Sequence, residues 1–269
     1  MRAAIKFAYD GTCFHGYQRQ PDVRTVEGEL LRALISLGAM DSTEDSLFRS
    51  GSRTDSGVSA IGNVLALNTE FRLDELPRAL NSKIRDIWVW GYATVSEDFN
   101  PRHAVRRWYR YYFPPRVSPE GLRKASCPFI GQHDFALFAY RDERSSVRTI
   151  DKIEVSENRS FTILDIWGES FLRGMVRKVA GVMEHVASGQ LTLTDIEKAL
   201  RGEGGDFDIA PAEPTVLMDV EYGFNFIVLE REREFSLRLR NRIWNAHLSL
   251  EILSLILNRS QGKEIRRVE

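Results

Sequence analysis

Residues 48–67, FRSGSRTDSGVSAIGNVLAL, constrain the fold of this chain more than any other stretch. The first part is rich in serine and glycine and holds one carboxylate, Asp55, between Gly51 and Gly57. The last part ends in the apolar run VLAL, which is typical of a buried strand. We therefore predict a polar loop held by a strand of the core, which makes a rigid support for a single reactive group, Asp55.

The tripeptide Asp55-Ser56-Gly57 has two other interpretations when it is taken alone. These residue types favour turns for local reasons, so it could be a turn and nothing more. It is also the tripeptide of aspartic proteases, but those enzymes need two carboxylates that share one proton, with hydrophobic residues before the Asp. Here Arg53 and Thr54 precede it, and the chain contains no second such tripeptide. The protease interpretation is therefore weak.

The order of the other patterns predicts an α+β fold with helices over a sheet. Thr25 is suited to cap the first helix, and Thr194 with Glu197 predicts a capping box at the last helix of the second half. We predict domains at residues 1–105 and 106–222. The expected elements are strands at 3–9, 64–67, 87–95, 108–113, 151–155, 161–167 and 217–222, and helices from 25, from about 74, over 171–187 and from 194.

Residues 223–269 form a third segment, for which we predict a helical extension. An apolar stripe with alternating spacings of four and three indicates one long helix. Either packing against the chain's own core or a dimer seam would cover this stripe. Its members are Leu239, Ile243, Ala246, Leu250, Leu253 and Leu257.

The formal net charge of −1 gives no indication of a nucleic-acid partner, but residues 102–124 hold seven Arg and Lys against one acid, Glu120. The aromatic residues of this block lie among the basic ones, an arrangement that suits phosphate contacts together with base stacking. A solvated strand face, on which arginine stems cover aromatic rings, explains the same pattern equally well. The aromatic residues are Trp108, Tyr109, Tyr111 and Tyr112.

Two cysteines, Cys13 and Cys127, provide neither a disulfide framework nor a metal motif, and the five histidines show no ligand spacing. We expect reduced thiols, no metal and a cytoplasmic location. The first residues, MRAAIKFAYDG, contain no apolar run of signal-peptide length. The late run LSLEILSLIL is short and interrupted by Glu251, so we expect no membrane span.

Residues 53–60, RTDSGVSA, resemble the R-T-D-A-G-V-H-A signature of the TruA family of tRNA pseudouridine synthases, with Ser56 and Ser59 as departures. The resemblance covers roughly residues 1–222 and follows the family's order of motifs. The other matching segments are YDGTCFHGYQRQ, TVEGEL, FNPRHAVRRWYRYY, GQHDFALF, RTI, FLRGMVRKVAG and the late AP.

The resemblance implies two similar halves with mostly antiparallel sheets and helices on one side, around a central RNA-binding cleft. It implies isomerisation of uridine to pseudouridine in the anticodon stem-loop of tRNA, at positions 38 to 40, by a homodimer. The reaction changes no oxidation state, so no cofactor is expected. Two alternatives stay open, namely a non-catalytic tRNA-binding module on the same scaffold and a synthase that acts on another RNA site.

The resemblance also implies roles for individual residues. Asp55 is the expected catalytic carboxylate, Arg177 its partner and Tyr109 the ring that stacks on the target uracil. Arg177 and Arg173 lie four apart on one helix face, and Tyr109 lies in a strand, so exposed arginines and a core tyrosine are the plain interpretations. Arg53 is expected to position the flipped nucleotide. The other expected RNA contacts are Arg102, Arg106, Arg107, Arg110, Arg173 and Lys178.

Overall fold

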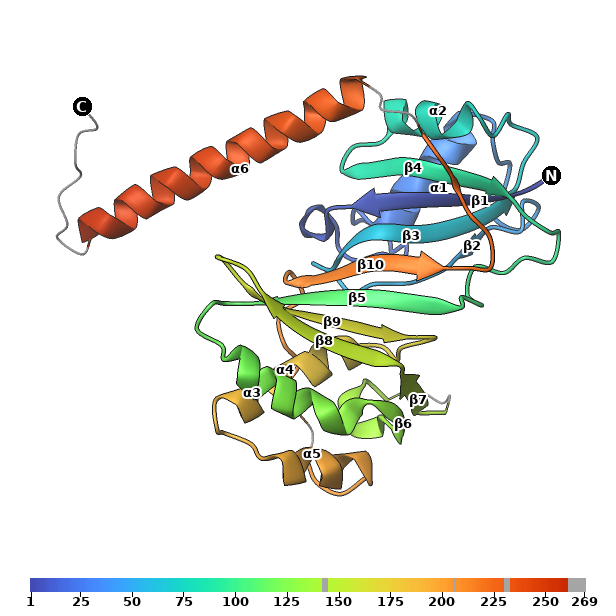
Figure 1. Ribbon diagram of the computed structural model, residues 1–269. Coiled ribbons are helices and arrows are strands. Elements are labelled where there is room, and N and C mark those ends of the chain that lie inside the picture. The colour runs from blue at the N-terminus through green and yellow to red at the C-terminus, as the bar shows by residue number, and fades with distance from the viewer. Residues whose placement is uncertain (142–144, 206, 230–232, 261–269) are drawn as a thin grey trace. The chain divides into compact units, whose positions relative to one another are not determined.

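The strands pair into one sheet of nine and one of two (Figure 1). The smaller sheet pairs β6 (Gly131–Asp134) with β7 (Val147–Ile150). The larger sheet contains β1 (Arg2–Tyr9), β2 (Arg49–Ser50), β3 (Ser59–Asn68), β4 (Ile87–Thr94), β5 (Arg106–Phe113), β8 (Lys152–Glu157), β9 (Thr162–Gly168), β10 (Thr215–Glu221) and β11 (Ile227–Val228). Its strand order is β11-β4-β1-β3-β10-β5-β9-β8, and β2 pairs with β3.

This computed structural model describes residues 1–141, 145–205, 207–229 and 233–260. The chain divides into two compact units, Met1–Val228 and Leu229–Glu269. Everything that concerns the sheet and the candidate site lies in the first unit.

Strand β10 joins the two halves of the larger sheet. It follows all the other long strands in the chain, but it lies between β3 and β5, parallel to β3 and antiparallel to β5. Every other pair in the sheet is antiparallel. The α+β class is therefore confirmed, but the halves share one mixed sheet where separate sheets were expected. The pairing of a late strand with an early one depends on the tertiary fold. No local sequence pattern could therefore predict that β10 lies between β3 and β5.

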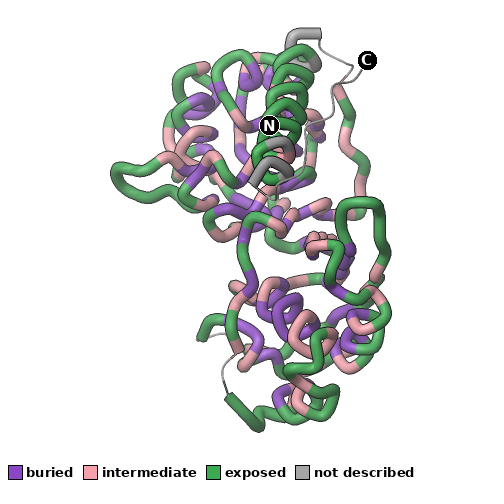
Figure 2. Tube along the Cα trace, turned by 90° about the vertical axis from the view of Figure 1, so that its left-hand side faces the viewer, coloured by how far each residue is buried: buried purple, intermediate pink, exposed green. Residues whose placement is uncertain are grey.

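One row of residues crosses the middle of the sheet. Tyr9 is paired with Ala60, Ala60 with Leu217, Leu217 with Tyr109 and Tyr109 with Ile166. Residues directly opposite each other on paired strands project to the same face. This row therefore connects two hydrophobic clusters on one face, and Tyr109 packs against both of them. Figure 2 shows the buried positions gathered in these two groups.

Helices cover this face, as predicted. The first cluster includes apolar residues of α1 (Val26–Ser36) and α2 (Leu76–Lys83). The second includes residues of α3 (Pro119–Ser126), α4 (Met175–Ala187) and α5 (Leu193–Leu200). Helix α3 was not predicted from the sequence.

The helix starts test the capping predictions. Thr25 caps α1 by accepting a hydrogen bond from the backbone nitrogen of Gly28, which confirms the prediction. The capping box of α5 was placed wrongly at Thr194, because Thr192 and Asp195 form it. Two overlapping T-x-x-[DE] patterns in LTLTDIEK allow both placements, and the backbone used the earlier one. Helix α4 begins later than expected, since Gly174 at φ 75° precedes it in a left-handed conformation.

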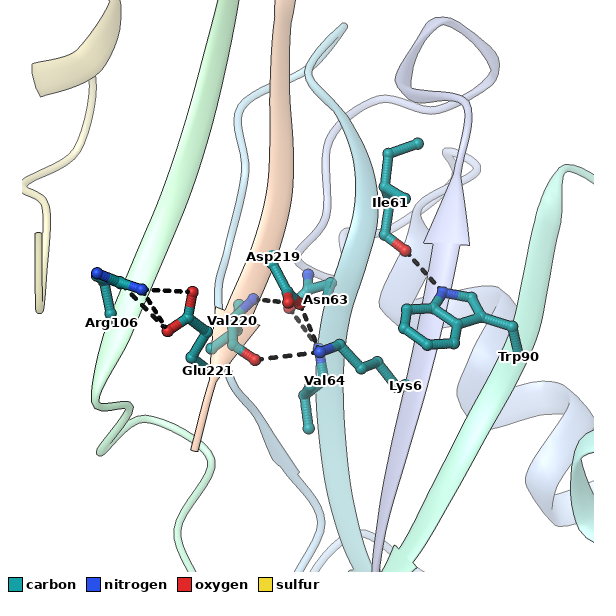
Figure 3. A network of polar contacts seen from close by, with 9 residues as sticks. All are labelled: Lys6, Ile61, Asn63, Val64, Trp90, Arg106, Asp219, Val220 and Glu221. Atoms are coloured by element: carbon teal, nitrogen blue, oxygen red, sulfur yellow. Dashed lines mark hydrogen bonds and ion pairs between the residues drawn. The ribbon is translucent and has the colours of Figure 1, made fainter. Parts of the chain in front are cut away.

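The opposite face of the first half carries an ion pair whose lysine is buried (Figure 3). The Lys6 ammonium pairs with the carboxylate of Asp219 and donates to the Val220 carbonyl at 3.4 Å. It also lies 4.9 Å from the ring centroid of Phe226 and 5.3 Å from that of Trp90, within cation–π range. These contacts fasten the segment before β11 to the back of the sheet.

The second unit contains one long helix, α6 (Arg233–Ser260), within the segment 223–269 for which a helical extension was predicted. Residues 227 and 228 of that segment form strand β11 of the first unit. Many of its apolar side chains are exposed, among them Leu237, Ile243, Trp244, Leu250 and Leu253. What covers the apolar stripe stays a prediction.

Candidate active site

The loop that carries Asp55 is held from both sides. The backbone nitrogen of Tyr17 donates to the Thr54 carbonyl at 3.1 Å, and the hydroxyl groups of Tyr9 and Thr54 are 2.8 Å apart. Gly57 has φ 87°, and a Cβ there would lie 3.1 Å from Ala212. Only glycine adopts this conformation without strain, so the turn after Asp55 is fixed against the segment before β10.

Arg177 of α4 meets Asp55 across 122 residues of sequence. Its Nη1 donates to Oδ2 of Asp55 at 2.9 Å, and its Nε donates to the Ala210 carbonyl at 2.8 Å. The Asp55 side chain is 20% exposed and that of Arg177 is 15% exposed. A charge-assisted bond in such a sheltered place orients the carboxylate.

The second oxygen of Asp55 is left open. Among the described residues no donor lies within hydrogen-bond distance of Oδ1, and Nε of Arg173 is 3.6 Å away. Arg173 is 76% exposed, and its guanidinium lies 5.1 Å from the ring centroid of Tyr140. The site therefore presents one carboxylate oxygen towards solvent, and the exposed guanidinium of Arg173 lies beside it.

Tyr109 of β5 lies at the junction of the two clusters, on the helix-covered face. Its ring makes an edge contact with Phe171, with centroids 5.3 Å apart. Burial raises the pKa of Tyr109 above its ordinary value, which nearby Arg107 opposes and the charge of Asp55 reinforces. Tyr109 is therefore a neutral phenol at neutral pH. Tyr111, two residues on, is 3% exposed and belongs to the second hydrophobic cluster.

Arg107 has a structural position, and its prediction as an RNA contact is corrected. It is 7% exposed, and its guanidinium donates to the Ser52 hydroxyl at 3.0 Å and to the carbonyls of Gly51, Arg102 and Glu169. The chain itself uses these donors, so none points outward. Arg107 instead ties the Asp55 loop to β5, a role that a count of basic residues did not reveal.

Arg106 and Arg110 lie on the face opposite Tyr109, because successive residues of a strand alternate. Arg106 binds both carboxylate oxygens of Glu221 (Figure 3), and Arg110 binds both oxygens of Asp165 at 2.9 and 2.8 Å. Their predicted role as RNA contacts stays a prediction, and both lie on the face away from Tyr109. The acids that neutralise them come from other strands, but the alternation itself was visible in the sequence.

The other predicted residues fall into two groups. Arg53 and Arg102 are exposed and line a cavity of about 370 Å³ beside the Asp55 loop, where Arg53 donates to Gln18 at 3.1 Å. Lys178 is 5% exposed, so it offers no surface contact, although it lines another cavity of about 610 Å³ with Tyr140. Sequence reasoning missed Ser52, Tyr140 and the Ala210 carbonyl as supports of the site.

Within the described residues, no group of three or more His, Cys, Asp and Glu is close enough to hold a metal ion. No helix in the same part of the chain combines the length and apolar content that a membrane span requires. Cys13 and Cys127 are free thiols.

Comparison with known proteins gives a consistent result. Residues 125–223 match the family model described as tRNA pseudouridine synthase. The chain is 44% identical over 227 residues to tRNA pseudouridine synthase A of Pyrococcus furiosus, covering 82% of this chain and 84% of that protein. It is 40% identical over 267 residues to the protein of the same name from Pyrococcus abyssi, covering 95% and 100%.

A more distant relative from Methanosarcina mazei, also called tRNA pseudouridine synthase A, is 40% identical over 239 residues, with 83% of this chain and 85% of that protein covered. Among solved structures, a chain of a Cbf5-Nop10-Gar1 complex superposes with a TM-score of 0.35 and 13% identity. That superposition covers 68% of this chain and less than half, 44%, of the other.

Proposed function

The chain belongs to the tRNA pseudouridine synthase A family, and from this premise we propose that Asp55, Arg177 and Tyr109 carry out its reaction. It is a tRNA pseudouridine synthase, an isomerase that converts uridine into pseudouridine. The observation that carries the residue assignment is the open oxygen of Asp55, whose other oxygen Arg177 holds at 2.9 Å.

The reaction balances without any co-reactant. The bond between N1 of uracil and C1′ of the ribose breaks, the base turns, and C5 bonds to C1′. The proton on C5 leaves, and N1 gains one. No electron leaves the substrate, so the protein must supply only a carboxylate, a route for protons and a pocket for the detached base.

Asp55 provides the carboxylate through its Oδ1. This oxygen either attacks C1′ or removes the proton from C2′, and both routes need an ionised carboxylate with an unoccupied lone pair. The bond from Arg177 to Oδ2 leaves Oδ1 available and fixes its direction, because α4 holds Arg177 through the Ala210 carbonyl. The glycine turn at Gly57 keeps the backbone of the loop from following the substrate.

Tyr109 provides a ring against which uracil stacks, within the row that joins the two clusters. Because its pKa is raised, its hydroxyl acts as a neutral group that relays the C5 proton and does not act as a phenolate base. Arg53 holds the nucleotide that has left the stem, a step that costs a few kcal/mol. These roles rest on position in the site and on the matched motifs.

The substrate in this proposal is the anticodon stem-loop of tRNA, bound in a cleft between lobes that divide near residue 105, and the enzyme acts as a cytoplasmic homodimer. The relatives' name supports tRNA as the substrate. The free thiols of Cys13 and Cys127 are compatible with a reducing compartment. Sedimentation of the full chain at micromolar concentration would test the dimer.

The experiment is release of tritium from tRNA transcripts labelled at uridine C5, followed by chemical mapping of pseudouridine. Wild-type protein is expected to release tritium from uridines of the anticodon stem-loop, and Asp55→Ala is expected to bind tRNA and release none. Pseudouridine at other positions would mean that the modified uridine lies outside the anticodon stem-loop. Tight binding of every tRNA without release would favour a non-catalytic tRNA-binding module.

A further inference from the structure

The cavity of about 370 Å³ beside the Asp55 loop is surrounded by arginines that come from four separate segments of the chain. Arg53 belongs to the Asp55 loop, two residues before the carboxylate, and Arg49 belongs to β2. Arg19 lies in the loop before α1, and Arg102 lies before β5. All four are exposed. No stretch of sequence contains them together, so only folding forms this cluster.

Three of these arginines differ from those on the back of the sheet in their partners. In the described part of the chain, Arg19, Arg49 and Arg53 form no ion pair with a carboxylate, whereas Arg106 and Arg110 each bind one through two contacts. Burial, and after it the positive charge of Arg49, lowers the pKa of the neighbouring Arg2. The cavity is therefore a place where positive charge is left unneutralised.

Two glutamates line the cavity, but both are already engaged. Glu27 accepts hydrogen bonds from the Ser50 hydroxyl and from the backbone nitrogen of Arg19, each at 3.0 Å. Glu44 accepts from the Thr43 hydroxyl at 2.7 Å. With four arginines against two glutamates, the lining has an excess of positive charge, and Glu27 serves to hold the Arg19 backbone in place.

A buried tyrosine lies next to the wall of the cavity. Tyr17 is 0% exposed, and burial raises the pKa of its hydroxyl. The polar groups that act on this hydroxyl belong to Ser50, Glu27 and Arg53, all of which line the cavity. Ser50 donates its own proton to Glu27, and its oxygen can still accept one from Tyr17.

We infer that this arginine cavity binds the phosphodiester backbone of the RNA strand next to the target uridine, an inference that rests on the proposed function. Guanidinium groups match phosphate oxygens in geometry and charge. Arg53 connects the cavity to the loop of Asp55, so a phosphate held there fixes the register of the strand at the carboxylate. The RNA-binding surface is therefore this folded cluster, which shares only Arg102 with the linear basic block at 102–124.

The test compares two double variants in tRNA binding at several salt concentrations. Arg19→Gln with Arg49→Gln removes two cavity arginines. Arg72→Gln with Arg201→Gln removes two exposed arginines that already pair with carboxylates elsewhere. The cavity variant is expected to weaken binding about 10- to 100-fold and to lower the slope of log K against log salt by about two. The control is expected to match wild type in both.

Kinetics separate binding from chemistry. Because the arginines contact the substrate away from the reacting atoms, the cavity variant should raise KM and leave kcat at saturating tRNA within about threefold. Thermal unfolding of both variants should match wild type, since all four side chains are exposed. A cavity variant with the salt slope and KM of the control would overturn the inference, and the activity of wild type would be untouched by that result.

The phosphate itself is located with stem-loop RNAs that carry one neutral methylphosphonate linkage each. At the linkages beside the target uridine, combining the neutral linkage with the cavity variant should cost less binding free energy than the sum of the two separate losses. Both changes remove the same contact. Additive losses at every linkage would contradict the assignment.

Inorganic phosphate is titrated as a competitor, and competition at low millimolar concentration that disappears in the variant would assign the cavity to a free anion instead. If wild type forms no pseudouridine, the proposed function fails. The tRNA-binding measurements on the two double variants would still test whether the cavity binds RNA.

Discussion

Two aspartate–arginine pairs in this molecule have nearly the same bond length and opposite characters. Arg177 donates to Asp55 at 2.9 Å, and Arg110 donates to Asp165 at 2.9 and 2.8 Å. The Asp165 side chain is 7% exposed and also accepts a hydrogen bond from Trp108, so both its oxygens are engaged. Asp55 is 20% exposed, and one of its oxygens is open.

The supports of the two pairs differ as well. Asp165 and Arg110 lie opposite each other on the paired strands β9 and β5, where the sheet itself sets their separation. Asp55 and Arg177 meet from a loop and a helix that no hydrogen-bonding ladder connects. A pair saturated within a sheet stabilises the sheet, whereas a half-saturated pair on a loop keeps binding capacity for a substrate. The two roles therefore differ in how many carboxylate oxygens are engaged. The distance between the arginine nitrogen and the carboxylate oxygen does not distinguish them.

The largest expected effect is on catalysis at the open pair. Asp55→Asn keeps the shape of the side chain but removes the charge and the nucleophilic oxygen. We expect kcat to fall by about 10³-fold or more, as for other residues that react directly with substrate. Tritium release measures the rate, and filter binding measures affinity for tRNA, which should stay within about threefold. Retained activity would remove Asp55 from the reaction.

The matched change at the saturated pair should affect folding and leave catalysis alone. Asp165→Asn leaves Arg110 without its carboxylate, so we expect a loss of about 2–3 kcal/mol in the free energy of unfolding. This is less than the full cost of a broken buried pair, because the Arg110 side chain remains 24% exposed to water. Urea unfolding measures the loss. A fall in kcat as large as that of Asp55→Asn would contradict the assignment of the Asp165 pair to structure alone.

Arg177→Gln tests whether the arginine orients Asp55. The variant can still donate one hydrogen bond but lacks the positive charge of the guanidinium. We expect kcat to fall about 100-fold with little change in KM, because the lost contact is not made to the substrate. Arg177→Lys keeps the charge and should recover part of the lost kcat, which distinguishes this from a purely structural effect. An equal kcat for the two variants would mean that Arg177 only packs the helix.

The smallest effect concerns the tyrosines on the helix-covered face of β5. Burial, with the charge of Glu184 as a smaller cause, raises the pKa of Tyr111 to about 12. The folded state therefore favours the neutral phenol, so its contribution to stability is complete below pH 10 and is lost as pH rises towards 12. We expect the free energy of unfolding to fall by about 1.4 kcal/mol per pH unit for this group. Tyr111→Phe should reduce the slope by that amount, and an unchanged slope between the two proteins would contradict the shift.

Much of the local structure followed from the sequence. Alternation predicted β1, β4 and β5, and the cap at Thr25 predicted the start of α1. The strands predicted at 151–155 and 161–167 correspond to β8 and β9, whose turn the backbone bond from Asn158 to Phe161 closes at 2.9 Å. These features depend on neighbours within a few residues, which is why a pattern in the sequence is enough to find them.

The candidate site was predictable in part for a related reason. Asp55 stands out because glycine and serine surround it, and a loop before a strand positions it. The basic block at 102–124 was a poor guide, since cations of this block have partners within the protein. Arg106 and Arg110 find acids on other strands, Lys124 pairs with Glu120, and Arg107 is buried. A count along the sequence records charges but not what neutralises them.

By itself, the sequence determined the α+β class, the position of the carboxylate in a rigid loop and the helix that carries Arg177. The tertiary structure decided that Arg177 reaches Asp55, that β10 joins both halves in one sheet, and that arginines from four segments surround one cavity. The reason is electrostatic and geometric. The effect of a charged side chain depends on the groups within a few ångströms of it, and in this chain those groups come from segments as far as 214 residues away.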